Sequence, residues 1–307
     1  RLTALAKPSV APLWEQCPAV DAVRLQAGGW RGTFVTAARL RSEGYAAAYI
    51  LPNSFRSALI PFLARIPERR GAPGHWRACL LTATAPLLAA EPPVHQSREY
   101  MALLGVSEQP TAPLFPLCRP PEETRHRVRE RLDALAGTRA AAPLVALFPG
   151  AARGPSKRWP VERFAELARR LAAAGARVLV LGTAAEQALC AAVAGGTAAV
   201  VNLAGHFALA ELPAVLLECA LVIANDSGGM HLAAAMGVPV VAVFGVTDPA
   251  RTGPLGTRCT VLTAAETSRS RDVPRNARRA RQALESITVD RVHEAARAWL
   301  EAPTTRR

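Results

Sequence analysis

Residues 221–235, which run LVIANDSGGMHLAAA, contain the turn that decides the fold. Apolar residues that favour a strand are followed at once by polar and glycine residues, and then by an alanine-rich stretch that favours a helix. Asp226 or Ser227 is the natural N-cap, which leaves backbone N–H groups free to bind phosphate. The Asp226 carboxylate can accept hydrogen bonds from sugar hydroxyls. The alternative is a purely structural capping box with His231 packed against the sheet.

A second turn of the same kind lies at residues 148–160, FPGAARGPSKRWP. It follows an apolar strand and leads into a helix whose first position suits Pro160. Its glycines allow close approach of a ligand, and its exposed amides can hold a diphosphate together with Lys157 and Arg158. Only two of the 37 basic residues are lysines, so a lysine at this place indicates a need for a compact point charge. The alternative is a surface loop with two solvated bases.

Strands and helices alternate throughout two similar halves, which predicts an α/β protein with parallel sheets. In the first half the expected strands are 2–6, 21–25 and 46–51, and the expected helices are 8–16, 33–43, 55–64 and 95–104. In the second half the expected strands are 144–148, 177–181, 198–202, 221–224 and 238–244, with helices between them. Five prolines in residues 107–121 predict a stiff connector. We therefore expect domains at 1–118 and 122–288, with ligands bound beyond the carboxyl ends of the strands.

Composition narrows the class of protein. The chain has 307 residues, 50% of them hydrophobic and 20% charged, and no apolar run long enough to span a bilayer. The six cysteines are scattered without a metal-ligand spacing, which predicts reduced thiols in a cytoplasmic protein and no metal site. A net charge of +13 favours an anionic partner such as a phosphorylated substrate or a membrane surface. Nucleic acid is not expected, because only 5% of the residues are aromatic and no element interleaves them with basic ones.

Several motifs in order along the chain resemble glycosyltransferase family 9, the lipopolysaccharide heptosyltransferases. Those of the second half are Pro149-Gly150, Ser156–Pro160, Asn225–Ala235 and Phe244–Pro249. Those of the first half, Leu51–Ala58 and Ile66–Gly71, are most similar to members called heptosyltransferase II. One such motif is a weak signal, whereas four at suitable spacing are a strong one. The resemblance covers nearly the whole chain.

The resemblance implies a GT-B architecture, in which two Rossmann-like domains face each other across a cleft. It also implies an inverting enzyme that transfers a heptose from ADP-heptose to the lipid A and inner-core acceptor of lipopolysaccharide, without a metal or cofactor. The final helix, 289–301, would pack on the first domain. The donor-binding residues would be Gly150, Ala151, Lys157, Asp226, Ser227, Gly228, Gly229, His231 and Thr247, and the acceptor side would have Asn53, Ser54 and Arg56.

Two features depart from the family pattern. Family members begin with a strand and a Gly-Asp loop whose aspartate is thought to be the general base, and nothing in this sequence corresponds. We therefore expect that the first domain lacks its first strand, that the chain is a fragment, and that the catalytic base is not among its residues. The other departure is an arginine-rich stretch without cysteine, Ser268–Arg281. It is interpreted either as a solvated surface or as a contact with anionic lipid, which would make the protein peripheral on the inner membrane.

Two other functions stay open at this point. One is a related GT-B enzyme with another nucleotide sugar or acceptor. The other is a catalytically impaired fragment that binds a sugar nucleotide. The sequence does not indicate the acceptor sugar or the oligomeric state.

Overall fold

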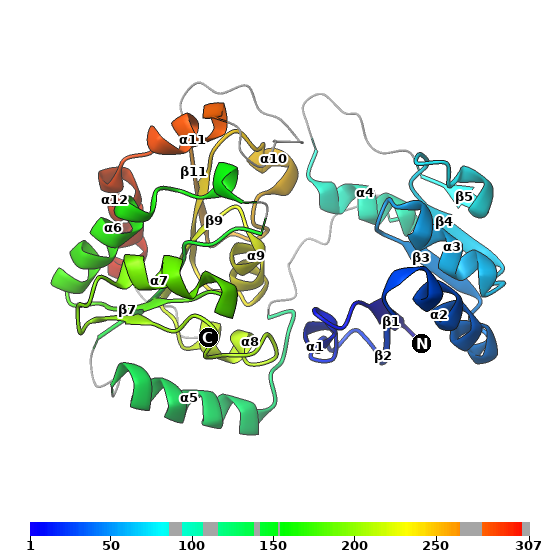
Figure 1. Cartoon of the computed structure of the whole chain (residues 1–307), viewed down its shortest axis with the longest axis horizontal. Coiled ribbons are helices and arrows are strands. Elements are labelled where there is room, and N and C mark those ends of the chain that lie inside the picture. The colour runs from blue at the N-terminus through cyan, green and yellow to red at the C-terminus, as the bar shows by residue number, and fades with distance from the viewer. Residues whose placement is uncertain (86–93, 107–115, 138–141, 153, 265–277, 303–307) are drawn as a thin grey trace. The chain divides into compact units, whose positions relative to one another are not determined.

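The computed structural model describes residues 1–85, 94–106, 116–137, 142–152, 154–264 and 278–302. The chain divides into two compact units, Arg1–Pro113 and Leu114–Arg307, called unit 1 and unit 2 below. Each is built from parallel strands and helices (Figure 1). The division falls inside the proline-rich segment from which the boundary between residues 118 and 122 was predicted.

Unit 2 contains one sheet of six parallel strands in the order β11-β10-β9-β6-β7-β8. The strands are β6 (Leu144–Phe148), β7 (Arg177–Val180), β8 (Val200–Asn202), β9 (Leu221–Asn225), β10 (Val240–Phe244) and β11 (Cys259–Thr263). Counted from β6, this is the 3-2-1-4-5-6 order of a doubly wound Rossmann sheet. The order reverses between β6 and β9, where Phe148 pairs with Ala224. This switch point fixes where a ligand is expected.

Helices cover both faces of this sheet (Figure 1). On one face α6 (Val161–Ala173), α7 (Gln187–Ala194), α11 (Arg278–Glu285) and α12 (Val289–Glu301) share one hydrophobic core with the strands. The other helices include α5 (Glu122–Ala136), α8 (Leu212–Leu217), α9 (Gly228–Ala235) and α10 (Pro249–Thr252), and the 3-10 turns η2 (Pro155–Lys157) and η3 (Ala184–Glu186). β6, β9 and β10 are buried along their whole length, which explains why their sequences are unbroken apolar runs.

The last helix, α12, packs inside unit 2. Its Val292 and Ala296 are fully buried in the core of this unit, beside the residues of α6. Trp299 Nε1 donates a hydrogen bond to Thr260 Oγ1 at 2.9 Å, which ties the helix to β11. The sequence assigned this helix to the surface of the first domain. That expectation came from the family resemblance and stays a prediction, and the structure shows that the apolar residues of the helix cover the sheet of unit 2.

The described strands of unit 1 form two parallel sheets. In one, β1 (Thr3–Ala6) pairs with β2 (Ala22–Leu25), and in the other β4 (Glu68–Gly71) lies between β3 (Ala47–Ile50) and β5 (Ala83–Thr84). Among the described residues, β1 and β3 each have one strand partner. The expectation that this domain lacks its first strand stays a prediction.

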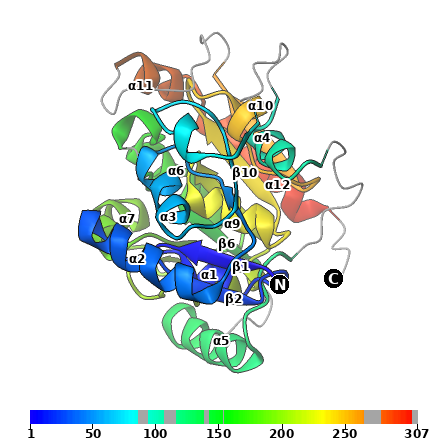
Figure 2. The ribbon, with the colours of Figure 1, turned by 90° about the vertical axis from the view of Figure 1, so that its right-hand side faces the viewer.

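The helices of unit 1 are α1 (Ala11–Trp14), α2 (Gly29–Glu43), α3 (Phe55–Leu63) and α4 (Gln96–Leu103), with the 3-10 turn η1 (Ala78–Leu80). α2 and α3 lie side by side, as Figures 1 and 2 show. They enclose a small core of Ala37, Leu40, Ile60, Ala64 and Ile66. A second small core joins Ile50, Ala58 and Leu80.

Some elements were not predicted. β4 reads ERRG and β5 is two residues long, so neither carries an apolar period that a sequence pattern could reveal. α5, α11 and β11 were also missed. No helix in the described part of the chain has both the length and the apolar character needed to cross a membrane.

Candidate functional site

The two predicted turns meet at the switch point of the unit 2 sheet. The loop after β6 carries Gly150 and Lys157, and the turn after β9 carries Asp226. Because β6 and β9 are parallel neighbours, their carboxyl ends lie at the same edge of the sheet. This is the place where doubly wound sheets bind their ligands. The structure therefore brings together, in unit 2, two motifs that are about seventy residues apart in the sequence.

Asn225 holds the two turns together. Its side chain is fully buried at the end of β9. Its Oδ1 accepts a hydrogen bond from Trp159 N at 2.9 Å, and its Nδ2 donates to Pro149 O at 2.8 Å. One amide thus satisfies a backbone donor and a backbone acceptor at opposite ends of the loop after β6. The loop is shaped by this residue before any ligand arrives.

Trp159 is the other anchor of the loop. It is 2% exposed, and its Nε1 donates to Ile287 O at 2.9 Å. Its ring meets Phe164 edge to face, with 5.0 Å between the ring centroids. This tryptophan therefore belongs to the hydrophobic core of unit 2.

Lys157 and Asp226 form an ion pair between Nζ and Oδ2. The lysine side chain is 14% exposed and the carboxylate 8%, so both charges are largely withdrawn from water. Removing one partner of such a pair is destabilising, because the other charge is then left buried and uncompensated. Asp226 N donates to Val243 O at 3.3 Å, which fixes the carboxylate at the edge of the sheet. The pair is a cation and an acceptor group held side by side at the switch point.

The beginning of α9 adds polar groups to the same place. Ser227 occupies the N-cap position but makes no side-chain cap bond, and its Oγ is buried without a partner among the described residues. Ser156 Oγ, in η2, is also buried without a partner there. A Cβ on Gly228 would meet nothing within 4 Å, whereas a Cβ on Gly229 would lie 2.6 Å from the Phe148 ring. Gly228 therefore leaves open space at the helix N-terminus, and Gly229 allows the helix to pack on β6.

Glu186 approaches the same loop from the end of β7. Its Oε2 accepts from Thr183 N and Oγ1, both at 2.9 Å, in a capping box. Its Oε1 lies so close to Gly150 that a Cβ there would be 1.9 Å away. Arg158 Nη2 is 3.9 Å from the same oxygen. The closeness of Glu186 explains why position 150 is a glycine, a reason that no local sequence pattern could show.

The remaining predicted donor residues lie at the ends of the same strands. Ala151 is buried directly after Gly150, and Thr247 is buried three residues after β10. Asp248, also buried, caps α10 by accepting from Ala250 N at 3.1 Å. His231 is exposed on the first turn of α9. It does not pack against the sheet as the structural alternative required.

The predicted acceptor residues belong to unit 1, in the loop after β3. Ser54 is the N-cap of α3 and accepts a hydrogen bond from Ser57 N at 3.2 Å. Asn53 is half-buried beside Leu103 and Tyr100 of α4, and Arg56 is half-buried in the first turn of α3. Arg77, which the sequence did not single out, is fully buried behind this loop and bonds to its backbone.

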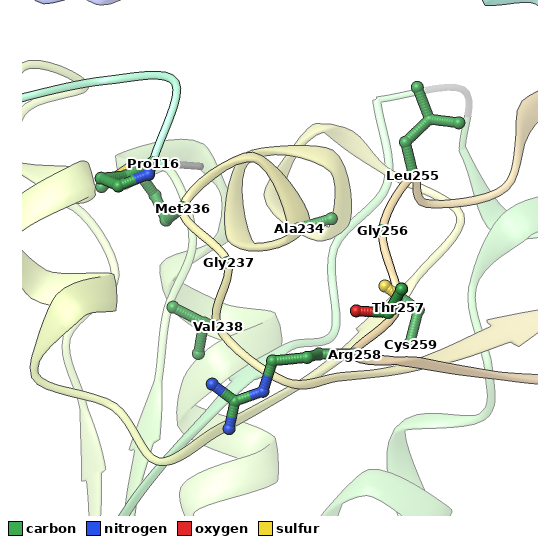
Figure 3. Close-up of a pocket in the computed structure, with 10 residues that line it drawn as sticks. All are labelled: Pro116, Ala234, Met236, Gly237, Val238, Leu255, Gly256, Thr257, Arg258 and Cys259. Atoms are coloured by element: carbon green, nitrogen blue, oxygen red, sulfur yellow. The ribbon is translucent and has the colours of Figure 1, made fainter. Parts of the chain in front are cut away.

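A separate cavity of about 220 Å³ lies at the opposite edge of the unit 2 sheet. Figure 3 shows it between the segment after α9, at Met236–Val238, and the segment 255–259, which ends at the first residue of β11. These segments lead into β10 and β11, so the cavity is at the amino ends of the strands. It is therefore not part of the site built by Lys157 and Asp226.

Within the described ranges, no three His, Cys, Asp or Glu side chains are grouped as metal ligands. The six cysteines are free thiols. Burial, with the nearby Glu186 charge, raises the pKa of the Cys190 thiol to about 11. Cys190 is thus a packing residue rather than a nucleophile.

Known proteins are similar to this chain in sequence and in fold. A family model described as glycosyltransferase family 9 (heptosyltransferase) matches residues 34–302. Lipopolysaccharide heptosyltransferase 2 of Salmonella typhimurium is 36% identical over 231 residues, which are 73% of this chain and 66% of that protein. Lipooligosaccharide heptosyltransferase 2 of Haemophilus influenzae is 34% identical over 274 residues, 83% of this chain and 77% of that protein.

The solved structure of the Escherichia coli ADP-heptose LPS heptosyltransferase II has the same architecture. It superimposes with a TM-score of 0.82 at 29% sequence identity, covering 97% of this chain and 89% of that one. The α/β class with Rossmann-like parallel sheets and the family resemblance, both predicted from the sequence, are confirmed by these matches.

Proposed function

This chain belongs to glycosyltransferase family 9, and from that premise we propose that it transfers a heptose from ADP-heptose to an inner-core sugar of lipopolysaccharide, with inversion. The observation that carries the proposal is the Lys157–Asp226 pair at the switch point of the unit 2 sheet. Relatives that match this chain bear the name heptosyltransferase 2. The segment shared with the Salmonella protein spans 66% of that protein, so the activity of this chain is a matter for experiment.

We assign the donor diphosphate to Lys157 and the N-terminus of α9. The ammonium group supplies a positive charge, and the first amides of α9 supply donors that have no partner within the helix. The hydroxyls of Ser156 and Ser227, buried without partners among the described residues, would be satisfied by phosphate oxygens. Gly228 leaves room for this approach.

The two carboxylates of the site suit the hydroxyl groups of the donor. Asp226, held by Lys157, would accept hydrogen bonds from the heptose, since a carboxylate has up to about four acceptor positions. Glu186, above Gly150, would accept from the ribose, because it stands at the end of the strand next to β6. Doubly wound sheets use an acidic residue in this relation to the phosphate loop for ribose recognition.

Asn53, Ser54 and Arg56 are proposed as the acceptor side. The guanidinium of Arg56 suits a phosphorylated inner-core or lipid A sugar, since arginine forms paired hydrogen bonds with phosphate. An inverting displacement also needs a base that takes the proton from the acceptor hydroxyl. None of these three side chains is a carboxylate, and the expectation that the base is an aspartate of a preceding Gly-Asp loop stays a prediction. In the proposed reaction Lys157, Arg158 and the first amides of α9 would stabilise the leaving diphosphate in the place of a metal ion.

A lipid-linked acceptor places the reaction at a membrane surface, and we propose that the chain binds there peripherally. The net charge of +13 favours an anionic surface. Arg278, Arg279 and Arg281 are exposed on α11, whose other face is buried in the core. The rest of the arginine-rich stretch lies outside the described residues. Binding to anionic vesicles that falls with salt would support this contact, and equal binding to neutral vesicles would contradict it.

Calorimetry with ADP, ADP-heptose, UDP-sugars and GDP-sugars tests the donor site. We expect Lys157→Met to weaken ADP binding by about ten- to a hundredfold, because a charge-assisted contact is lost. The matched control is Lys7→Met, since Lys7 is the other lysine and is exposed in unit 1. Asp226→Asn should keep ADP binding and lose the additional affinity for ADP-heptose. Binding of UDP-sugars as tight as that of ADP-heptose would contradict the donor assignment.

A transfer assay with lipopolysaccharide inner-core oligosaccharide then separates an enzyme from a binding protein. The proposal expects heptose transfer that depends on Lys157. The same assay is repeated with a first strand and Gly-Asp loop of the family type joined ahead of Arg1. If both forms bind ADP-heptose tightly but transfer no heptose, the protein binds a sugar nucleotide without catalysing transfer.

A further inference from the structure

Arg77 is an arginine that is fully buried in unit 1 and forms no ion pair with another described residue. It precedes η1 and is 0% exposed. Burial lowers the pKa of its guanidinium, and no charged neighbour contributes to that change. A buried charge of this kind is costly, and a neutral side chain of similar volume would often be more favourable. The position of Arg77 therefore calls for an explanation beyond packing.

The guanidinium bonds to the backbone of the loop after β3. Nη1 donates to Pro52 O and lies 3.5 Å from Ser54 O and 3.4 Å from Ser57 Oγ. Nε donates to Ala72 O at 2.8 Å, which ties the loop to the end of β4. The carbonyl groups on both sides of Asn53 are thus turned toward one planar cation. Ser57 Oγ lies within hydrogen-bond distance of the same two carbonyls, 2.8 Å from Pro52 O and 2.6 Å from Ser54 O, and its one proton can be donated to either of them.

The surrounding residues are fitted to this cation. A Cβ on Gly71 would lie 2.7 Å from Arg77 Nη2, so the glycine leaves the space that the guanidinium fills. Nη2 itself is buried without a partner among the described residues. A small cavity, about the size of one water molecule, lies next to the loop and is lined by Asn53, Ala72, Tyr100 and the buried Glu99, among others. The arrangement fixes the loop from behind.

We propose that Arg77 is a positioning residue of the acceptor site: it fixes the backbone of residues 52–57 so that Asn53 and Arg56 are held ready for a phosphorylated sugar. The inference rests on the proposed function, which assigns this loop to the acceptor. Arg77 does not touch the acceptor. It acts through the carbonyls of Pro52 and Ser54, and its charge adds to the attraction of the loop for a phosphate group.

Two variants disturb Arg77 in different ways, and one control matches it. Arg77→Lys keeps the charge but removes the planar fork that reaches several carbonyls. Gly71→Ala keeps the arginine but displaces its guanidinium, because the new Cβ would lie 2.7 Å from Arg77 Nη2. The control is Arg69→Met, because Arg69 also donates to backbone carbonyls, those of Leu80 and Ile66, outside the loop. A structural effect alone would make all three variants alike.

The measurements are calorimetry with phosphorylated and dephosphorylated inner-core oligosaccharide, calorimetry with ADP, and amide hydrogen exchange. Arg77→Lys and Gly71→Ala are expected to weaken binding of the phosphorylated oligosaccharide about tenfold or more. ADP binding should stay within about twofold, since the donor site is in unit 2. The Ser57 amide, which donates to Ser54 Oγ, should exchange about tenfold faster. Arg69→Met should lower the melting temperature and change neither the oligosaccharide affinity nor the Ser57 exchange.

The proposal is overturned if both variants bind the oligosaccharide like the unchanged chain, or if Arg69→Met weakens binding as much as they do. If the unchanged chain binds ADP but neither form of the oligosaccharide, the acceptor assignment of the loop fails. In that case Ser57 exchange tells whether Arg77 fixes the loop. If the Ser57 amide exchanges as slowly in both variants as in the unchanged chain, Arg77 does not fix the loop. If it exchanges faster, Arg77 fixes the loop but serves only the structure of unit 1.

Discussion

The sheet of unit 2 runs unbroken through six strands, whereas the strands of unit 1 form a pair and a triplet. In unit 2, β6, β9 and β10 are buried along their whole length. In unit 1, Leu5 of β1, Leu25 of β2 and Tyr49 of β3 are exposed. Strands paired on both sides open only when the sheet opens, while strands paired on one side can open locally. Unit 2, which we propose binds the donor, is therefore expected to be the more rigid, and unit 1, which we propose binds the acceptor, the less cooperative.

The two units also differ in how they hold the loop that follows a strand. In unit 2 the neutral amide of Asn225 bridges Trp159 N and Pro149 O. In unit 1 the charged guanidinium of Arg77 gathers the carbonyls of Pro52 and Ala72. An amide satisfies its partners at little electrostatic cost, whereas a buried cation is costly. The difference suggests that the loop of unit 1 requires a positive charge and that of unit 2, which has Lys157, does not.

The largest expected effect is in hydrogen exchange across the two sheets. Amides of β6, β9 and β10 should be protected at least about a thousandfold more than those of β1 and β3, because the latter can exchange by opening of small sheets. Native-state exchange followed by mass spectrometry measures this directly. Equal protection in both units would show that the two small sheets of unit 1 open only when the whole molecule unfolds, and the expected difference in rigidity between the units would be wrong.

Replacing Asn225 should have the next largest effect. Asn225→Ala leaves Trp159 N and Pro149 O buried without their partners, which we expect to cost about 2–4 kcal/mol. ADP affinity should fall with it, because the loop that carries Lys157 loses its shape. Asn225→Asp is the matched variant, since it can still accept from Trp159 N but places a buried carboxylate against Pro149 O, and its cost should be at least as large as that of Asn225→Ala. Urea unfolding and ADP calorimetry on both variants test this, and an Asn225→Ala chain as stable as the unchanged one would refute the role.

Much of unit 2 was predictable from the sequence because its signals are local. The run Leu144–Phe148 followed by Pro149-Gly150 marks a buried strand and its turn, whatever the rest of the chain does. The same holds for 221–226, so Lys157 and Asp226 could be placed at one sheet edge by topology alone. Their ion pair was not predicted, because it depends on the register of β6 against β9.

The parts that were missed depend on contacts between distant residues. Glu186 explains Gly150 only once the end of β7 is placed over the loop. Arg77 looks like any other base in an arginine-rich chain until its burial is known. Likewise, the family resemblance implied that helix 289–301 packs on the first domain, and only the structure shows its contacts with α6 and the sheet of unit 2. Sequence patterns thus identify which face is buried, and tertiary structure decides its partner.

Two neighbouring glycines at the start of α9 should differ in stability. Gly229→Ala places a Cβ 2.6 Å from the Phe148 ring, and overpacking of this kind costs about 1–3 kcal/mol. Gly228→Ala meets nothing within 4 Å and should change stability by less than about 1 kcal/mol. If Gly228 lines the diphosphate site, its variant should instead weaken ADP binding. Thermal unfolding and ADP calorimetry on the pair separate packing from binding, and equal unfolding of both variants would show that α9 can shift away from β6.

The smallest expected effect is a pH dependence of the stability of unit 2, which would bring its stability closer to that of unit 1 at low pH. His293 lies on α12, and burial, followed by the charges of Arg170 and Arg297, lowers the pKa of its imidazole below the ordinary 6.5, while Asp290 opposes this. A lowered pKa in the folded state means that the stability is present above pH 6.5 and is lost as the pH falls through the folded value. The unfolding free energy of unit 2 should therefore decrease between pH 7.5 and 5.5 relative to His293→Gln, which cannot titrate. The loss should be smaller than that of Gly229→Ala, because Arg170 also pairs with Glu166 and Asp290, which keep part of its charge engaged. An identical pH profile for both chains would place His293 in contact with water in the folded state.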